Sequence, residues 1–299
     1  MLNQMRAEWL KISRRPMAWL LLVVFLATLL LKLGALFLVI GFHEGSFTGG
    51  DAKIQILREA ELAQFRLQLG FPGIFGAILA HINGLGGLCA IILAAGTVGS
   101  EYDWGTMRLQ LTRQPCRSKY LLAKIFVLFL TLFAGMLLAL VFGASFGLLS
   151  STLLNLPNRL QFSDLLLLPV TLFLAFLVLL PYVMATIAFS TLGRSLLAGV
   201  VGGMLFLTLD LSAGGTLAFL PKLDKTLNLI YQLLLQPNIN TLVILNAQTY
   251  GLEPSRISQF NLEKLPSPLH AIFVITFYSL IFAGYAFYGF TKRDVLGPN

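Results

Sequence analysis

The sequence predicts an all-α membrane protein with six transmembrane helices. Of its 299 residues, 57% are hydrophobic and only 11% are charged, which excludes an ordinary soluble domain and a disordered chain. Six apolar runs are long enough to cross a hydrocarbon core of about 30 Å, and polar, often basic connections separate them. We expect these spans at 17–40, 71–98, 121–150, 164–191, 196–219 and 269–290.

The first 15 residues predict an interfacial helix. Leu2, Met5, Trp9 and Ile12 repeat at helical spacing, with basic residues around them. A helix of this kind lies flat on the membrane surface, and Pro16 is the point at which the chain turns into the first span. Although a basic start followed by an apolar run is typical of a signal peptide, this apolar run is too long for one, so we interpret it as an uncleaved span.

The second span carries two polar candidates for a substrate pathway. It is preceded by an amphipathic helix that starts near Asp51 and that we place on the outer surface. The span itself is rich in glycine, which lets helices approach closely. His81 and Asn83 lie at membrane depth, where packing hydrogen bonds are about twice as frequent as a substrate role.

The connection between the second and third spans is amphipathic and densely basic. Ser100 is a good helix N-cap, and Glu101 and Asp103 would lie at the positive end of the helix dipole. Trp104 and the apolar residues after it give one face of a short helix along the membrane surface, which Pro115 ends. We therefore predict a helix over 100–114. An ordinary positively charged inner loop is the alternative.

The next three spans differ in their small and polar residues. Gly135, Ala139, Gly143 and Gly147 recur every four residues in the third span and predict a helix-packing face. Pro181 is expected to kink the fourth span. Asp210 is the one acidic residue that lies deep in a span, the fifth, where a transport pathway and a packing hydrogen bond are equally good explanations.

The longest connection covers residues 221–268. It contains two apolar pieces, 224–235 and 239–250, that Pro237 divides and that are too short to span. We expect a re-entrant helical hairpin on the outer side. The inner connections are richer in Lys and Arg than the outer ones when both termini are placed in the cytoplasm, so we predict that orientation.

Several functional classes are excluded by the motifs. The net charge of +8 is spread over the loops without a nucleic-acid-binding motif, and it suits anionic lipid headgroups. Cys89 and Cys116 fall at different depths, which argues against a disulfide, and no metal-ligand spacing occurs. The sequence has no P-loop and no hydrolase or metalloprotease motif. We therefore expect no enzyme and no cofactor bound by this chain.

The inner connection resembles the cytoplasmic loop of ABC type-2 transporter permeases. The resemblance rests on the order Glu101-Tyr102-Asp103-Trp104-Gly105-Thr106-x-Arg108, followed by Arg117 and Lys124. It implies that 100–114 is a coupling helix that inserts into a separate ATPase subunit. Many relatives carry a small residue or Ser where this chain has Pro115 and Cys116. The implied coupling residues are Glu101, Asp103, Trp104, Gly105, Thr106, Arg108 and Arg117.

The resemblance also implies an assembly and an activity. Residues 1–299 would form a single permease domain that pairs with a second permease, identical or homologous, in the plasma or inner membrane. Each permease would rest on one ATPase, so the complex would hold two copies, and ATP and Mg²⁺ would be bound there. The apolar spans favour export of a hydrophobic or amphipathic substrate such as a lipid, antibiotic or peptide. An ATPase-independent carrier or channel and a non-transporting scaffold remain alternatives.

Overall fold

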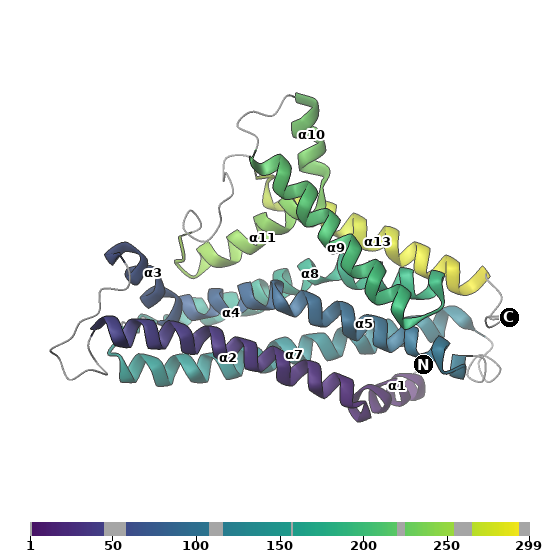
Figure 1. The fold of residues 1–299 in the computed structure, drawn as a ribbon, viewed down its shortest axis with the longest axis horizontal. Helices are drawn as coiled ribbons and strands as arrows, with labels where there is room; N and C mark the ends of the chain where they lie inside the picture. Colours follow the sequence, from purple (N-terminus) through teal and green to yellow (C-terminus); the bar gives the residue numbers. More distant parts are fainter. Residues whose placement is uncertain are drawn as a thin grey trace.

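The computed structural model describes residues 2–44, 58–107, 116–156, 158–219, 225–253 and 265–292. The described chain contains helices and no strands, and most helices run roughly along the long axis of the molecule (Figure 1). Six of these helices are long and apolar enough to cross a membrane, which confirms the predicted class of a six-span, all-α, multi-pass membrane protein. The six are α2 (Pro16–Glu44), α5 (Leu85–Asp103), α7 (Arg117–Leu153), α8 (Phe162–Gly193), α9 (Leu196–Phe219) and α13 (Pro268–Lys292).

The N-terminal segment is helical where the sequence predicts it. Helix α1 covers Leu2–Arg14, and Pro16 is the first residue of α2. A proline is tolerated there because the first N–H groups of a helix have no intrahelical acceptor. Figure 1 shows α1 turned away from α2 at the end of the molecule where α13 also ends. Its placement at the membrane surface stays a prediction.

The second span is interrupted, although the sequence predicts one continuous run over 71–98. Helix α4 covers Gly73–Asn83, α5 begins at Leu85, and Gly84 lies between them with φ −82° and ψ −97°. The Gly84 N–H bonds the Ala80 carbonyl and closes α4. Helix α3 (Glu59–Leu69) precedes α4 and meets it at 85°, so α3 and α4 together form a sharply bent pair.

The glycine face of the third span packs as predicted over part of its length. A Cβ added to Gly143 or Gly147 would lie 2.5 or 2.3 Å from the Cδ1 atom of an isoleucine on α4, so these two glycines allow a close helix crossing. A Cβ on Gly135 would meet nothing within 4 Å. The small residue there leaves space instead of a contact.

The long connection before the last span contains two helices, α10 (Lys225–Leu233) and α11 (Leu235–Thr249). The sequence predicts their boundary at Pro237, but the structure has it at Leu234, and Pro237 lies in the first turn of α11. Its missing N–H costs nothing in the first turn, where N–H groups lack intrahelical partners. Helix α11 contacts α4, α8, α9 and α13, whereas residues 254–264 lie outside the described chain.

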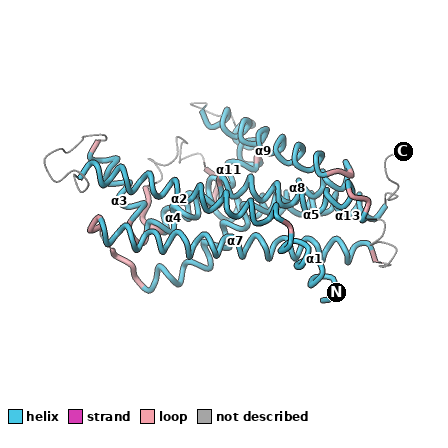
Figure 2. The backbone as a smooth tube through the Cα atoms, turned by 60° about the horizontal axis from the view of Figure 1, so that its bottom comes forward, coloured by secondary structure: helices cyan, strands magenta, loops and turns pink. Residues whose placement is uncertain are grey.

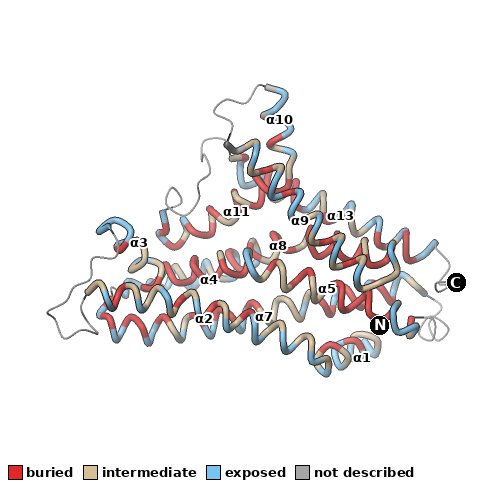
Figure 3. The backbone as a smooth tube through the Cα atoms, viewed as in Figure 1, coloured by how far each residue is buried: buried red, intermediate tan, exposed pale blue. Residues whose placement is uncertain are grey.

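Helix α8 is the centre of the bundle. Its buried residues contribute to all three apolar clusters: one with α2, α4 and α7, one with α5, α7 and α13, and one with α5, α9, α11 and α13. Helices α7 and α9 lie on opposite sides of α5 and α8 (Figures 1 and 2). The outward faces of the bundle are exposed (Figure 3) and largely apolar, as expected for a surface that contacts lipid.

Candidate functional site

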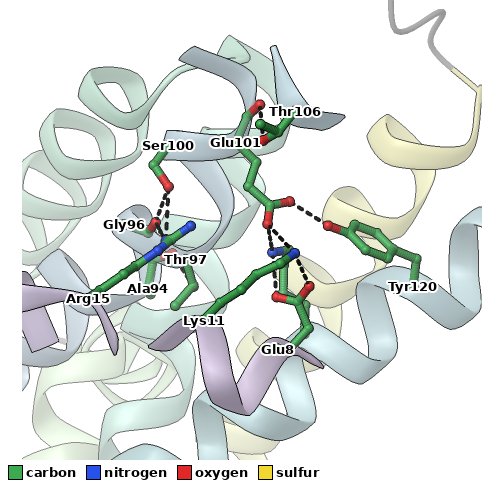
Figure 4. Close-up of polar contacts among 11 residues, drawn as sticks. Glu8, Lys11, Arg15, Ala94, Gly96, Thr97, Ser100, Glu101, Thr106 and Tyr120 are labelled. Carbon is green, nitrogen blue, oxygen red and sulfur yellow. Dashed lines mark hydrogen bonds and ion pairs between the residues drawn. The ribbon is translucent and has the colours of Figure 1, made fainter. Parts of the chain in front are cut away.

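Four charged side chains from three helices meet at the end of the molecule where α1 lies. We call Glu8, Lys11, Glu101 and Lys124 the charge cluster. Figure 4 shows Glu8, Lys11 and Glu101 pointing toward one another. Lys124 Nζ lies 2.8 Å from Glu8 Oε2 and 2.7 Å from Glu101 Oε1. Lys11 Nζ lies 2.6 Å from Glu8 Oε1 and 3.1 Å from Glu101 Oε1. The Tyr120 hydroxyl donates a further hydrogen bond to Glu101.

The charge cluster is buried and electrically balanced. Glu101 and Lys124 are each 1% exposed and Glu8 is 4% exposed, while Lys11 is half-buried. Two acids and two bases alternate, so each buried charge faces opposite charges on both sides. Such groups tolerate burial only while all partners remain in place. The cluster therefore fixes α1, α5 and α7 relative to one another.

Arg15 makes a second connection between the N-terminal segment and α5. Its Nη1 atom donates to the Gly96 carbonyl at 2.7 Å and to Ser100 Oγ at 3.0 Å. Its guanidinium lies 5.1 Å from the ring centre of Trp104, within the range of a cation–π contact. The corner between α1 and α2 is thus held against the last turns of α5.

The helix predicted over 100–114 does not begin at Ser100. Helix α5 continues to Asp103, and Ser100 Oγ donates to the Gly96 carbonyl four residues earlier instead of capping a new helix. Residues 104–105 form a turn, residues 106–107 are helical again, and 108–115 lie outside the described chain. Glu101 is therefore an internal residue of α5 and not part of a surface helix.

Three of the predicted coupling residues form one exposed turn, which we call the 103–105 turn. Asp103, Trp104 and Gly105 are exposed, with Trp104 at 65%. Gly105 has φ +65°, a left-handed conformation that favours glycine. The Thr106 hydroxyl donates to the Glu101 carbonyl at 3.4 Å, which closes the turn against the end of α5.

The 103–105 turn is attached directly to α9. Asp103 Oδ2 accepts a hydrogen bond of 3.2 Å from the N–H of Leu196, the first residue of α9. Gly99 lies four residues before Asp103 on α5. A Cβ on Gly99 would lie 2.4 Å from Leu196 Cα, so only glycine permits this approach of α5 to α9. Of the remaining coupling candidates, Arg117 bonds the Thr291 carbonyl at 3.3 Å, and Arg108 lies outside the described residues.

Asp210, the acidic pathway candidate, is 8% exposed and has partners within the chain. Its Oδ2 atom accepts a 2.7 Å hydrogen bond from the Tyr182 hydroxyl, and its Oδ1 atom accepts one of 3.0 Å from the N–H of Gln236. Gln236 is in the first turn of α11, so the carboxylate caps that helix. Asp210 thereby joins α8, α9 and α11.

The other two pathway candidates lie elsewhere, on α4. His81 Nε2 is 3.2 Å from Thr28 Oγ1, and its ring stacks on Phe25 at 5.3 Å between centres. The side-chain amide of Asn83 is buried and makes no hydrogen bond to the described chain. The structure therefore divides the three candidates between two regions. Among the described residues, no group of His, Cys, Asp or Glu side chains could hold a metal ion.

Sequence reasoning missed the partners of these residues. The sequence predicts a surface helix that includes Glu8, Lys11 and Arg15 but gives them no partners, and no motif points to Tyr120, Tyr182 or Gln236. One signal was present for Glu8. It follows Met5 by three positions and precedes Ile12 by four, so helical spacing puts this acid on the apolar face of α1.

Comparisons with known proteins agree with this architecture. The sequence is 29% identical over 182 residues to the uncharacterized protein YhcI of Bacillus subtilis (strain 168), an alignment that covers 49% of this chain and 57% of that protein. The aligned part thus spans little more than half of the relative's length. No solved structure was found to match the chain. The family described as "ABC-2 family transporter protein" matches residues 2–295. This family matches nearly the whole length of a membrane bundle with six spans, so the protein is a transporter permease. The chain belongs to the ABC-2 family of transporter proteins.

Proposed function

We propose that the chain is the membrane subunit of an ATP-powered exporter and that a separate ATP-binding subunit docks on the 103–105 turn and the residues that follow it. One observation carries this proposal: the exposed turn is bonded directly to α9 and continues from Glu101, whose buried contacts reach α1 and α7. Asp103 holds the start of α9, while Glu101, two residues earlier, holds α1 and α7. A displacement of the turn would therefore move those three helices together.

The assembly would contain two permeases, identical or homologous, each with one ATP-binding subunit that carries ATP and Mg²⁺. The exposed face of α9 supports this arrangement. It is apolar near the 103–105 turn and carries hydroxyl groups further along, in the order Leu197, Val201, Leu205, Thr208, Ser212 and Thr216. A second permease would cover this face, and an amphipathic substrate such as a lipid, antibiotic or peptide would pass beside it toward the outside.

Two glycines provide a matched test of docking. Gly105 and Gly251 both have positive φ, +65° and +74°, and a Cβ on either meets nothing within 4 Å. Leucine at either position should cost about 1–2 kcal/mol of stability because a side chain disfavours the left-handed conformation. Only Gly105→Leu should also reduce the ATP-binding subunit recovered with the tagged chain in mild detergent, by roughly tenfold for each 1.4 kcal/mol of lost contact.

The matched design separates docking from general damage. Loss of the ATP-binding subunit in both variants would mean that recovery reports stability alone. Full recovery and full ATPase activity with Gly105→Leu would remove the docking role from the turn. In that case the scaffold alternative, which predicts tolerance to substitution at 101–108, would be preferred.

A labelling experiment tests the orientation. Cys116 is exposed and directly precedes α7, and Asn158 follows the opposite end of that helix. In a Cys89→Ala background, an impermeant maleimide should label Asn158→Cys in intact cells and Cys116 only after permeabilisation. The opposite pattern would place the turn outside the cell, where no ATP-binding subunit could reach it.

A further inference from the structure

An apolar pocket of about 350 Å³ lies on the side of the bundle away from α9. Its wall is built by α1 and α2 on one side and by α7 on the other, with α5 between them. Its volume is within the range of about 300–1,000 Å³ that is typical of ligand sites. No charged side chain lines it, and no lining residue comes from α9, α11 or α13. The pocket is therefore separate from the face proposed for transport.

The rim of the pocket opens to the lipid-facing surface beside α1. Trp9, Trp19 and Leu138 lie on this rim and are 41%, 58% and 50% exposed. The indole N–H of Trp19 donates to the Ser13 carbonyl at 2.7 Å, which fixes its ring across the corner between α1 and α2. Tryptophan is enriched where headgroups meet acyl chains, so the rim has the chemistry of that boundary.

One basic residue shares the face of α1 that forms this rim. Arg6 precedes Trp9 by three positions and Ser13 by seven, so it lies on their face, whereas Arg14 directly follows Ser13 and points about 100° further round the helix. Both arginines are exposed, and no ion pair within the described chain involves either of them. The neighbouring Lys11 and Arg15, by contrast, are engaged with α5. An apolar pocket next to a positive charge that has no ion-pair partner in the described chain suits a molecule with an apolar chain and a negative headgroup.

We infer that the pocket holds an acyl chain of a resident anionic phospholipid, with the phosphate of its headgroup beside Arg6. The lipid fills the space between α2 and α7 that is left open because Gly135 has no Cβ. Because α1 carries two residues of the charge cluster, occupancy also supports the contact of α1 with α5 and α7. The inference does not depend on the proposed export function, since none of its residues belongs to the 103–105 turn or to α9.

The test uses a pair of glycines and a photoreactive lipid. Gly135 lines the pocket, whereas Gly284 is exposed on α13, and a Cβ on either meets nothing within 4 Å. The full chain is reconstituted in 3:1 phosphatidylcholine–phosphatidylglycerol vesicles with a trace of phosphatidylglycerol that carries a diazirine on its acyl chain. Peptides from α5 and α7 should be labelled most. Gly135→Leu should remove most of that label, Gly135→Ala part of it, and Gly284→Leu none.

A second arm tests the headgroup. Replacing Arg6 by alanine should weaken competition by unlabelled phosphatidylglycerol by up to about fivefold, since a basic residue near an anionic surface contributes about 1 kcal/mol. Arg58→Ala, at the other end of the molecule, should leave it unchanged. Label spread evenly over all lipid-facing helices, equal labelling of Gly135→Leu and Gly284→Leu, or equal competition by phosphatidylcholine would overturn the inference.

Discussion

Replacing Glu101 by alanine should lower the free energy of unfolding by about 3–5 kcal/mol. The change leaves Lys124 and Lys11 facing a single carboxylate, and Lys124 is 1% exposed, so an uncompensated positive charge stays buried. The Tyr120 hydroxyl loses its acceptor as well. Unfolding in detergent, followed by the reaction of the half-buried Cys89 with a maleimide in a Cys116→Ala background, measures the effect. The sequence alone suggests a folded but uncoupled variant, and the burial of Glu101 changes that expectation.

A second ion pair provides the control. Glu44 lies 2.7 Å from Arg66, but both side chains are partly exposed, at 23% and 39%. Glu44→Ala should therefore cost at most about 1 kcal/mol. Glu101→Ala combined with Lys124→Met should recover much of the loss, because the double change restores charge balance. Equal destabilisation by Glu101→Ala and Glu44→Ala would show that the charge cluster does not hold α1, α5 and α7 together.

Replacing Asp210 by leucine should release the start of α11 and destabilise the chain by about 2–4 kcal/mol. The change removes a helix cap, worth about 0.5–2 kcal/mol, and leaves the buried hydroxyl of Tyr182 without its acceptor, which costs about 1–3 kcal/mol. Asp210→Asn retains one acceptor oxygen and should cost about half as much. Proteolysis near residues 233–238, where α10 meets α11, should speed up in the leucine variant, since the start of α11 would no longer be held.

The asparagine variant also separates packing from transport. Asp164 is a partly exposed carboxylate that caps α8 by accepting the Gln161 N–H at 2.9 Å, so Asp164→Asn controls for the loss of a capping charge. Export that stays normal with Asp210→Asn while the leucine variant unfolds would assign Asp210 to packing. Loss of export of a cationic substrate, with unchanged stability and normal export by Asp164→Asn, would assign the carboxylate to the pathway.

The sequence by itself determined the helical class and the number of spans. A chain that crosses a membrane must satisfy its backbone hydrogen bonds within each segment, so long apolar runs have to be helices. The break at Pro16 and the two short helices before the last span follow from equally local rules, because a proline or a short apolar piece acts over a few residues. The boundary between α10 and α11 lies at Leu234 and not at Pro237 for a similarly local reason, because a proline is tolerated in the first turn of a helix.

Only the tertiary structure decided which polar groups meet. Lys11 and Glu101 are 90 positions apart, and Lys124 and Glu8 are 116 apart. Periodicity reports the face on which a residue lies but not the helix that packs against that face. Glu101 was therefore assigned to a surface helix, although three distant partners hold it inside the bundle. The sequence likewise predicts that Asp210 lies within the fifth span, but its partners on α8 and α11 depend on how these helices pack, which no local pattern encodes.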